Sequence, residues 1–164
     1  MRLSRFLLIA ALGSTALACQ KGPAETPPSP AGEAPKAAAM PKWSEAISHE
    51  VAFDAAQGQV LVTVQVKPGF HAYTVGETTG KPLQLLIGDD SEFGLEGDVQ
   101  YPKGIEKNLP VGRSVIVQGQ AEVKAKVKAK SDASKTVRGT FKYQVCTDEA
   151  CDRPRSKAFE LNAS

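Results

Sequence analysis

The feature that most constrains the fold of this chain is a two-residue alternation of apolar and polar side chains, which recurs from Lys42 onward. Successive side chains of a β-strand point to opposite faces, so each run gathers its apolar residues on one face of a strand. Gly, Pro, Asn and Asp turns separate the runs, as in antiparallel sheets. The runs lie at residues 47–53, 60–66, 83–87, 115–127, 137–145 and 159–161. We therefore predict an all-β fold, an immunoglobulin-like antiparallel β-sandwich with at most a turn or two of helix.

The segment AEVKAKVKAK, residues 121–130, tests this interpretation because its composition is typical of helices. Ala, Lys and Glu are good helix formers. Its apolar residues nevertheless recur at every second position, which would scatter them around a helix but gathers them on one face of a strand. We therefore predict a strand whose row of lysines faces solvent. A docking site for acidic partners is the less favoured interpretation of that row.

Residues 1–18 are typical of a bacterial export signal, because two arginines precede an apolar run too short to span a membrane as a stable helix. They end at Ala16-Leu17-Ala18-Cys19, which resembles a lipobox, where a lipoprotein precursor is cleaved and its cysteine acylated. Ala16 and Ala18 also fit an ordinary secretory cleavage site, which would leave Cys19 without lipid. We predict a lipoprotein signal peptide and a lipid on Cys19.

Lipidation would hold the protein in the bacterial cell envelope, anchored to a membrane through Cys19 and facing the periplasm. Gln20, rather than Asp, follows this cysteine, which slightly favours the outer membrane by resemblance to enterobacterial sorting. Residues 19–42 are rich in Pro and Ala and lack an apolar period, so we predict a disordered tether. The folded domain is then expected at residues 43–164.

The charge of the chain gives no reason to expect nucleic acid as a partner. Its formal net charge is +2, and the signal segment holds two arginines and no acid, so removal of that segment brings the net charge to zero. A neutral protein with mixed charges lacks the electrostatic footprint of nucleic-acid binding.

Two further cysteines, Cys146 and Cys151, lie in the segment YQVCTDEACDRP at residues 143–154. Disulfides persist in an oxidising compartment, and an acylated Cys19 leaves these two to pair with each other. Residues that flank a short hairpin loop can face each other at the Cα separation of about 5.5 Å that a disulfide needs. A loop this short contributes only about 2 kcal/mol as a structural staple. The residues alone therefore leave a staple and a redox couple about equally favoured.

A metal site is the third interpretation of the cysteine pair. It needs two more ligands, and the two histidines of the chain, His49 and His71, have no metal-ligand spacing to the cysteines or to each other. We therefore expect no metal, and we expect no other cofactor.

At the cysteine segment the sequence resembles a known family. YQVCTDEACDRP, followed by a strand, is similar to the region around the active cysteines in the N-terminal domain of DsbD, the periplasmic thiol:disulfide interchange protein, and in related disulfide-corrector domains. The segments KPGFHAYTV, GKPLQLLI and YPKG, at residues 67–75, 80–87 and 101–104, resemble further parts of these domains. The resemblance covers residues 43–161 and indicates a stand-alone member of this family, carried on a lipoprotein.

The resemblance implies an immunoglobulin-like sandwich in which Cys146 and Cys151 cycle between a dithiol and a disulfide. It places Phe70, His71 and Tyr73 on the strand beside the pair. The implied partners are periplasmic thioredoxin-like proteins or a separate membrane thiol reductase, because this sequence shows neither transmembrane helices nor a Cys-x-x-Cys thioredoxin domain.

The resemblance also implies a cap loop that shields the cysteines. Its expected place is residues 93–101, with Leu95 as the nearest counterpart of the aromatic cap residue of the family. One departure affects the surface where partners dock, since Asp152-Arg153-Pro154 stands where the family usually has Tyr-Pro-Pro.

Two functions remain as hypotheses. The leading one is a membrane-tethered periplasmic thiol:disulfide interchange module, a protein-disulfide reductase type without its own reductant domain. The alternative is a non-catalytic β-sandwich lipoprotein that binds a protein partner and keeps a purely structural disulfide. Within the pair, Cys146 ends a core-facing run and is expected to be buried, whereas Cys151 is flanked by polar residues and is expected to be the accessible sulfur that bonds to partners.

Overall fold

The computed structural model describes residues 42–163, so the signal segment, most of the tether and Cys19 lie outside the described residues. The described chain consists of one short 3-10 turn, η1 (Trp43–Glu45), and eleven strands. The strands are β1 (Ile47–Asp54), β2 (Gln59–Val66), β3 (His71–Tyr73), β4 (Gln84–Ile87), β5 (Phe93–Leu95), β6 (Ile105–Leu109), β7 (Gly112–Val117), β8 (Gly119–Ala129), β9 (Thr136–Tyr143), β10 (Val145–Cys146) and β11 (Arg155–Asn162). The predicted all-β fold is confirmed. Among the described residues there is no helix long and apolar enough to cross a membrane.

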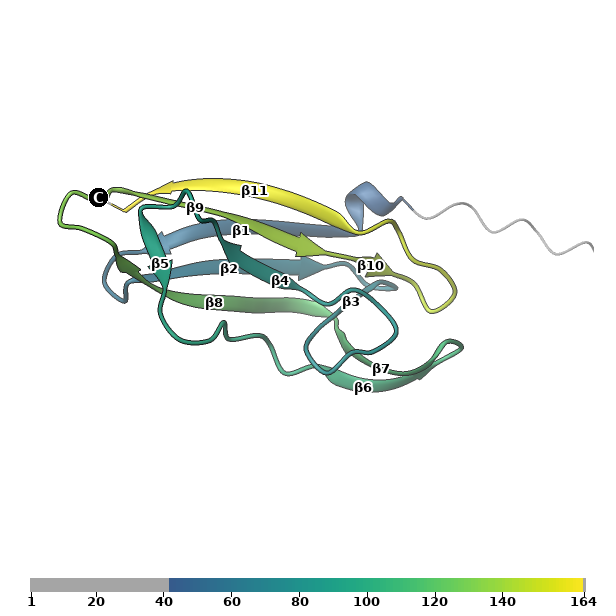
Figure 1. Ribbon diagram of the computed structural model, residues 1–164. Coiled ribbons are helices and arrows are strands. Elements are labelled where there is room, and N and C mark those ends of the chain that lie inside the picture. Colours follow the sequence, from purple (N-terminus) through teal and green to yellow (C-terminus); the bar gives the residue numbers. More distant parts are fainter. Residues whose placement is uncertain (1–41, 164) are drawn as a thin grey trace, which may run out of the picture. The chain divides into compact units, whose positions relative to one another are not determined.

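Two sheets form a sandwich with one core between them (Figure 1). The first has the strand order β1-β2-β8-β5 and the second the order β11-β9-β4. Neighbouring strands in both sheets are antiparallel. Val62 and Val64 of β2 and Leu85 and Phe141 of the second sheet are at most 2 % exposed, so the alternating apolar residues fill the core from both sides.

The segment AEVKAKVKAK forms most of β8, as its alternation predicts. Ala121, Val123, Ala125 and Val127 are buried, whereas most of the residues between them are exposed or half-buried. The register Val62↔Val123 places β8 directly beside β2. Packing against a neighbouring strand therefore overrides the helix propensity of this segment.

The prediction of one continuous run at residues 115–127 is wrong. The chain leaves β7 at Val117 and starts β8 at Gly119, whose φ of 69° lies in the left-handed region that glycine tolerates. Within β7, Ser114 and Ile116 are buried and Val115 is half-buried, which is the opposite parity to the buried residues of β8, and Val117 is buried where β7 ends. The strand thus passes from one sheet into another at this point.

The third sheet, with the strand order β10-β3-β7-β6, lies at one end of the sandwich (Figure 1). It receives β10 from β9 after a break at Gln144. One of its faces extends the sandwich core through Ala72 and Val145. Its other face carries a separate apolar cluster of Tyr73, Leu109, Ile116 and Cys146. The cysteine pair is therefore positioned by this small sheet.

Candidate functional site

Cys146 and Cys151 form a disulfide at the end of β10. The two residues face each other in an antiparallel bridge with a Cα–Cα separation of 4.0 Å, which is closer than the separation expected from sequence. The intervening loop closes on itself, since the Thr147 N–H donates to the Ala150 carbonyl at 2.8 Å and the Ala150 N–H donates to the Thr147 hydroxyl at 3.1 Å. A threonine at the start of the loop therefore supplies the turn that brings the cysteines together.

The two halves of the disulfide differ in access to solvent. Cys146 is 0 % exposed and belongs to the apolar cluster on the outer face of the third sheet. Cys151 follows the loop and is exposed. The difference predicted from sequence is present, so Cys151 is the residue of the pair that is open to solvent.

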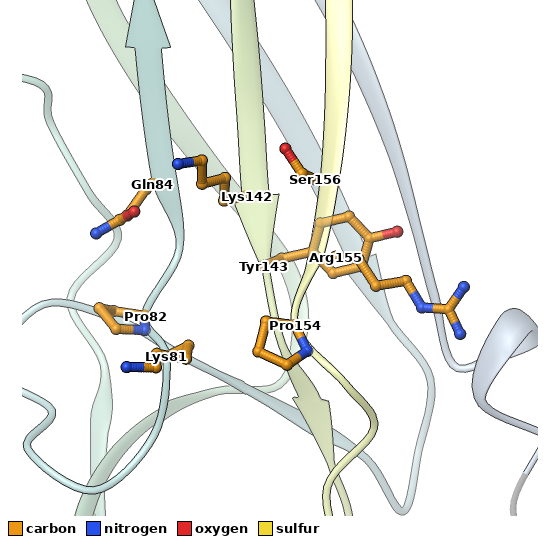
Figure 2. Close-up of a pocket in the computed structure, with 8 residues that line it drawn as sticks. All are labelled: Lys81, Pro82, Gln84, Lys142, Tyr143, Pro154, Arg155 and Ser156. Atoms are coloured by element: carbon orange, nitrogen blue, oxygen red, sulfur yellow. The ribbon is translucent and has the colours of Figure 1, made fainter.

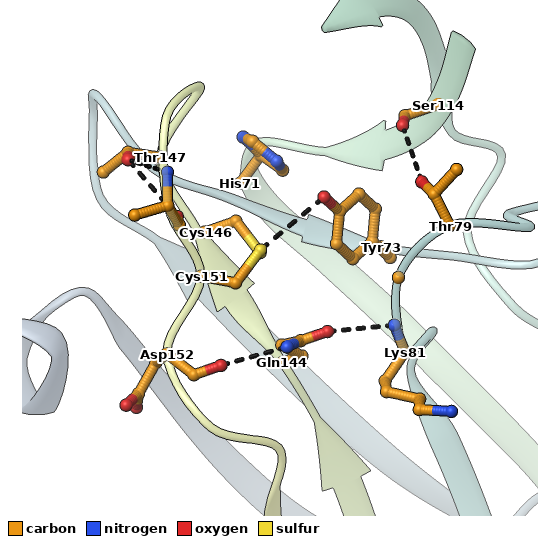
Figure 3. The surroundings of a disulfide bond; sticks show 12 residues. His71, Tyr73, Thr79, Lys81, Ser114, Gln144, Cys146, Thr147, Cys151 and Asp152 are labelled. Carbon is orange, nitrogen blue, oxygen red and sulfur yellow. Dashed lines mark hydrogen bonds between the residues drawn. A yellow bond between two sulfur atoms is a disulfide. The ribbon is translucent and has the colours of Figure 1, made fainter. Parts of the chain in front are cut away.

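β3 lies beside β10 and brings two of the expected neighbours to the disulfide. His71 is the Cα partner of Cys146 in the antiparallel register. The hydroxyl of Tyr73 lies 3.8 Å from the Cys151 Sγ (Figure 3). The His71 and Tyr73 rings meet edge to face, with centroids 5.3 Å apart. Phe70, the third expected neighbour, precedes β3 and packs instead against Trp43 and the sandwich core.

His71 is buried beside charged groups. Its side chain is 1 % exposed, and its Nδ1 lies 3.7 Å from an Asp148 carboxylate oxygen. Lys107 donates to both oxygens of that carboxylate at 2.8 Å. Burial lowers the pKa of His71, the charge of Asp148 opposes this, Lys107 lowers the pKa further and Glu77 raises it. The hydrogen bond from Lys107 lowers the pKa of Asp148, so the loop between the cysteines keeps its negative charge.

The segment after β3 wraps around Tyr73. A Cβ added to Gly80 would overlap the Tyr73 ring, so only glycine allows the chain to pass so closely. Glu77 organises this segment, because its carboxylate accepts hydrogen bonds from the Thr79 hydroxyl, the Gly80 N–H and the Val115 N–H. Burial raises the pKa of Tyr73, and the Glu77 charge raises it further, so the phenol stays protonated.

The prediction that residues 93–101 form a cap over the cysteines is wrong. Leu95 lies on β5 and pairs with Val127, whose N–H donates to the Gly58 carbonyl at the β1–β2 turn. That turn is at the opposite end of the sandwich from β10 (Figure 1). Leu95 is therefore not a neighbour of the disulfide.

Leu109 belongs to the apolar cluster that contains Cys146 and is 8 % exposed. It lies at the tip of the β6–β7 hairpin, and Lys107 of the same hairpin pairs with Asp148. This hairpin was not predicted from the sequence. The signal that could have found it is the turn sequence Pro110-Val111-Gly112 after Leu109, although the preceding residues alternate only weakly.

A pocket of about 190 Å³ opens next to the cysteine segment (Figure 2). Its lining residues are Lys81, Pro82, Gln84, Lys142, Tyr143, Pro154, Arg155 and Ser156. Gln144 joins two segments beside it, accepting from the Lys81 N–H and donating to the Asp152 carbonyl, both at 3.0 Å. The pocket therefore shares its walls with the chain that holds Cys151. Within residues 42–163, no three His, Cys, Asp or Glu side chains gather as metal ligands would.

Comparisons with known proteins identify the family of this chain and support its fold. Residues 39–163 match the family described as "Thiol:disulfide interchange protein DsbD, N-terminal". The fold is similar to the reduced DsbD N-terminal domain of Neisseria meningitidis, with a TM-score of 0.57 and 19% identity over 75% of this chain and 90% of that one. It is also similar to a structure of the complex between the DsbD and PilB N-terminal domains of Neisseria meningitidis, with a TM-score of 0.55 and 18% identity over 75% and 88%. A search of curated proteins finds no match to this chain.

Proposed function

This chain belongs to the family of DsbD N-terminal domains, and on that premise we propose that it passes electrons between periplasmic proteins through the Cys146/Cys151 pair. The observation that carries the proposal is the asymmetry of the disulfide, with Cys151 exposed and Cys146 fully buried. Thiol–disulfide exchange needs one accessible sulfur for the partner and one protected sulfur that resolves the mixed disulfide. A staple has no need of this arrangement.

The exchange proceeds in two steps. When the domain is reduced, the Cys151 thiolate attacks a partner disulfide, a Cys151–partner bond forms and one partner thiolate leaves. Cys146 then attacks Cys151, the internal disulfide reforms and the second partner thiol is released. Two electrons have moved to the partner, and the reverse sequence reduces this domain.

The proposed partners are thioredoxin-like periplasmic proteins or a separate membrane thiol reductase. Support comes from a relative, since a Neisseria meningitidis DsbD N-terminal domain has been solved in complex with the PilB N-terminal domain. The surface around Cys151 differs from the usual family pattern at Asp152 and Arg153. Asp152 is held by Arg155, whose Nε lies 2.7 Å from its carboxylate, so an ion pair stands at the position where the family usually has Tyr.

The proposed location is the periplasmic side of a bacterial envelope membrane, with lipid on Cys19 as the anchor and the outer membrane slightly favoured. This proposal rests on the lipobox-like segment that ends at Cys19. Residues 19–42 would let the domain reach partners away from the membrane surface.

The reduction potential of the Cys146–Cys151 disulfide tests the proposed function. Structural disulfides lie below about −300 mV, and exchange-active ones are more oxidising. We expect a potential above that value and a fraction of both thiols that is alkylated in living cells. A potential below it, together with thiols that are never alkylated in cells, would leave the alternative of a purely structural disulfide in a partner-binding lipoprotein.

A further inference from the structure

We propose that His71 is the general base that takes the proton from the Cys146 thiol when Cys146 resolves the mixed disulfide, with Asp148 as its positioning residue. The inference rests on the proposed function and assigns a role that the exchange chemistry leaves open. Cys146 is 0 % exposed in an apolar cluster, where a thiolate is disfavoured. The resolving step therefore needs a proton acceptor close to this buried sulfur.

The register of the third sheet places His71 beside Cys146. Directly opposite residues of an antiparallel pair project to the same face with Cβ atoms about 4.5–5.5 Å apart. His71 and Cys146 are such partners. Figure 3 shows the imidazole on the same side of the sheet as the disulfide and Tyr73. In the proposed resolving step the imidazole reaches the sulfur of the free Cys146 thiol.

The proton on His71 is positioned by Asp148. The carboxylate lies 3.7 Å from Nδ1, so the tautomer with its proton on Nδ1 is favoured. This leaves the lone pair on Nε2, which is buried and has no hydrogen-bond partner. An unpartnered buried polar atom carries a free-energy cost. A free Nε2 lone pair that accepts the proton of Cys146 would explain why this buried atom lacks a hydrogen-bond partner.

The charged groups around His71 support this role. Asp148 and Lys107 face it from the cysteine loop and β6, and Glu77 acts from the segment after β3. Burial and Lys107 lower the pKa of His71, whereas Asp148 and Glu77 raise it, and the net shift is downward. His71 is therefore neutral at pH 7 and free to accept a proton, and Asp148 then stabilises the imidazolium.

The step is balanced in atoms and electrons. The Cys146 S–H bond breaks and its proton moves to His71 Nε2. The Cys146 sulfur attacks the Cys151 sulfur, the Cys146–Cys151 bond forms and the Cys151–partner bond breaks. The electron pair of that bond leaves with the partner sulfur, which takes up a proton from the imidazolium or from water.

A partner-free reaction tests the role. We would use the full chain with Cys19→Ser, reduced and mixed with excess dithiobis(nitrobenzoic acid). The first nitrothiobenzoate released reports attack by Cys151, and the second reports resolution by Cys146. For the wild-type pair we expect the second rate to level off above a midpoint at or below about pH 6.5, the ordinary range of histidine. In His71→Phe we expect a second rate at least about tenfold slower at pH 7, rising only above about pH 8.5, the ordinary range of a free cysteine thiol, because the apolar surroundings of Cys146 disfavour its thiolate.

The controls separate a base from a packing residue. His49→Phe changes the other histidine, which contacts Phe141 and Tyr143 in the sandwich, and should leave both rates unchanged. Asp148→Asn changes a side chain that is 54% exposed and should move the midpoint of the second rate to lower pH. Equal second rates and pH profiles in wild type and His71→Phe would overturn the proposal, as would an equal loss in both phases. If His71→Phe does not fold, an unchanged midpoint in Asp148→Asn overturns it.

The outcome is independent of cellular partners. A disulfide that is never reduced in cells would refute the proposed function and leave the measured role of His71 in place. If the protein is active in exchange but the rate of the resolving step does not depend on His71, only this inference is refuted.

Discussion

The Tyr73 hydroxyl lies 3.8 Å from the Cys151 Sγ, so a buried phenol contacts the exposed half of the disulfide. Burial and the nearby Glu77 charge raise the pKa of this phenol, and it therefore remains a hydrogen-bond donor at neutral pH. In the reduced domain such a donor would stabilise the Cys151 thiolate. Tyr73 thus lies beside the sulfur that we propose meets the partner, whereas His71 is the register partner of the buried Cys146.

Tyr73→Phe removes that hydroxyl and keeps the ring. A hydrogen bond to a charged group contributes about 1.5–3 kcal/mol, so we expect the Cys151 thiolate to form at a pH about one unit higher or more. The rate of alkylation of the reduced protein as a function of pH measures this shift. Tyr143→Phe, a change of another buried tyrosine, is the matched control and should leave the profile in place. Identical profiles for wild type and Tyr73→Phe would mean that the hydroxyl does not act on the thiolate.

Leu109→Ala tests whether Leu109 shields Cys146 within their apolar cluster. The side chain is 8 % exposed and packs with Cys146, Tyr73 and Ile116, so its truncation should cost about 2–3 kcal/mol of unfolding free energy. Small thiols should also reduce the disulfide faster. Leu95→Ala is the matched control, because Leu95 is 46% exposed at the other end of the sandwich and should change stability by less than about 1 kcal/mol. Denaturant unfolding and dithiothreitol reduction rates measure both effects, and equal behaviour of the two variants would place the cover elsewhere.

The fold illustrates what an alternating sequence can and cannot reveal. β8 was predictable because Ala121, Val123, Ala125 and Val127 keep one parity and all face the core. The break between β7 and β8 was not predictable, because in the sequence Val115 and Val117 continue the same parity. In the structure, the positive φ of Gly119 turns the chain into another sheet. A local period carries no information about which sheet a strand joins.

The features of the site likewise divide into those that were predictable from the sequence and those that were not. The cysteine hairpin and its unequal exposure follow from a turn and an alternating run, which are local features. The ion pair of Lys107 with Asp148 and the apolar cluster of Leu109 with Cys146 join residues far apart in the chain. The family resemblance pointed to Leu95 because the cap was located by its position along the sequence. In the structure, the strand order β10-β3-β7-β6 places the β6–β7 hairpin, and not β5 with Leu95, in the sheet that holds the cysteines.

Glu77→Gln tests the segment that wraps around Tyr73. Burial raises the pKa of Glu77, but hydrogen bonds from Thr79, Val115 and Gly80 outweigh it and lower the pKa from 4.5 to about 2. A lowered pKa in the folded state means that the carboxylate contributes stability above pH 4.5, and that this contribution is lost as the pH falls towards about 2. Because Glu77 is partly exposed, we expect solvent screening to leave a loss of about 1 kcal/mol in Glu77→Gln at pH 7.

The pH dependence distinguishes this effect from a general loss of stability. The difference in unfolding free energy between wild type and Glu77→Gln should shrink as the pH falls below 4.5, since the wild-type carboxyl then also becomes neutral. Glu50→Gln, an exposed change on β1, serves as the control and should show no such trend. A Glu77→Gln difference that stays constant from pH 7 to low pH would exclude the carboxylate charge as its origin.

Lipidation of Cys19 predicts a defined mass and location. The residues Ala16-Leu17-Ala18 end directly on this cysteine, so we expect a mature protein that begins at Cys19 and carries acyl chains. Intact mass of membrane-extracted protein and labelling with a fatty-acid analogue measure the addition. Cys19→Ser should lose the label and the membrane association together. An unlabelled wild-type protein in the membrane-free fraction would contradict lipidation and favour an ordinary secretory signal.

The roles of the two sulfurs predict unequal trapping of partners. Cys146→Ser leaves the exposed Cys151 to form mixed disulfides and removes the sulfur that would resolve them, so these adducts should accumulate. Cys151→Ser leaves only Cys146, which is 0 % exposed in the apolar cluster with Leu109, and few adducts should form. Non-reducing gels of whole cells, with the double variant Cys146→Ser/Cys151→Ser as the background, measure the difference. Equal trapping by the two single variants would cancel the assignment of roles. Trapping by neither would indicate that the sulfurs meet no partner in the cell.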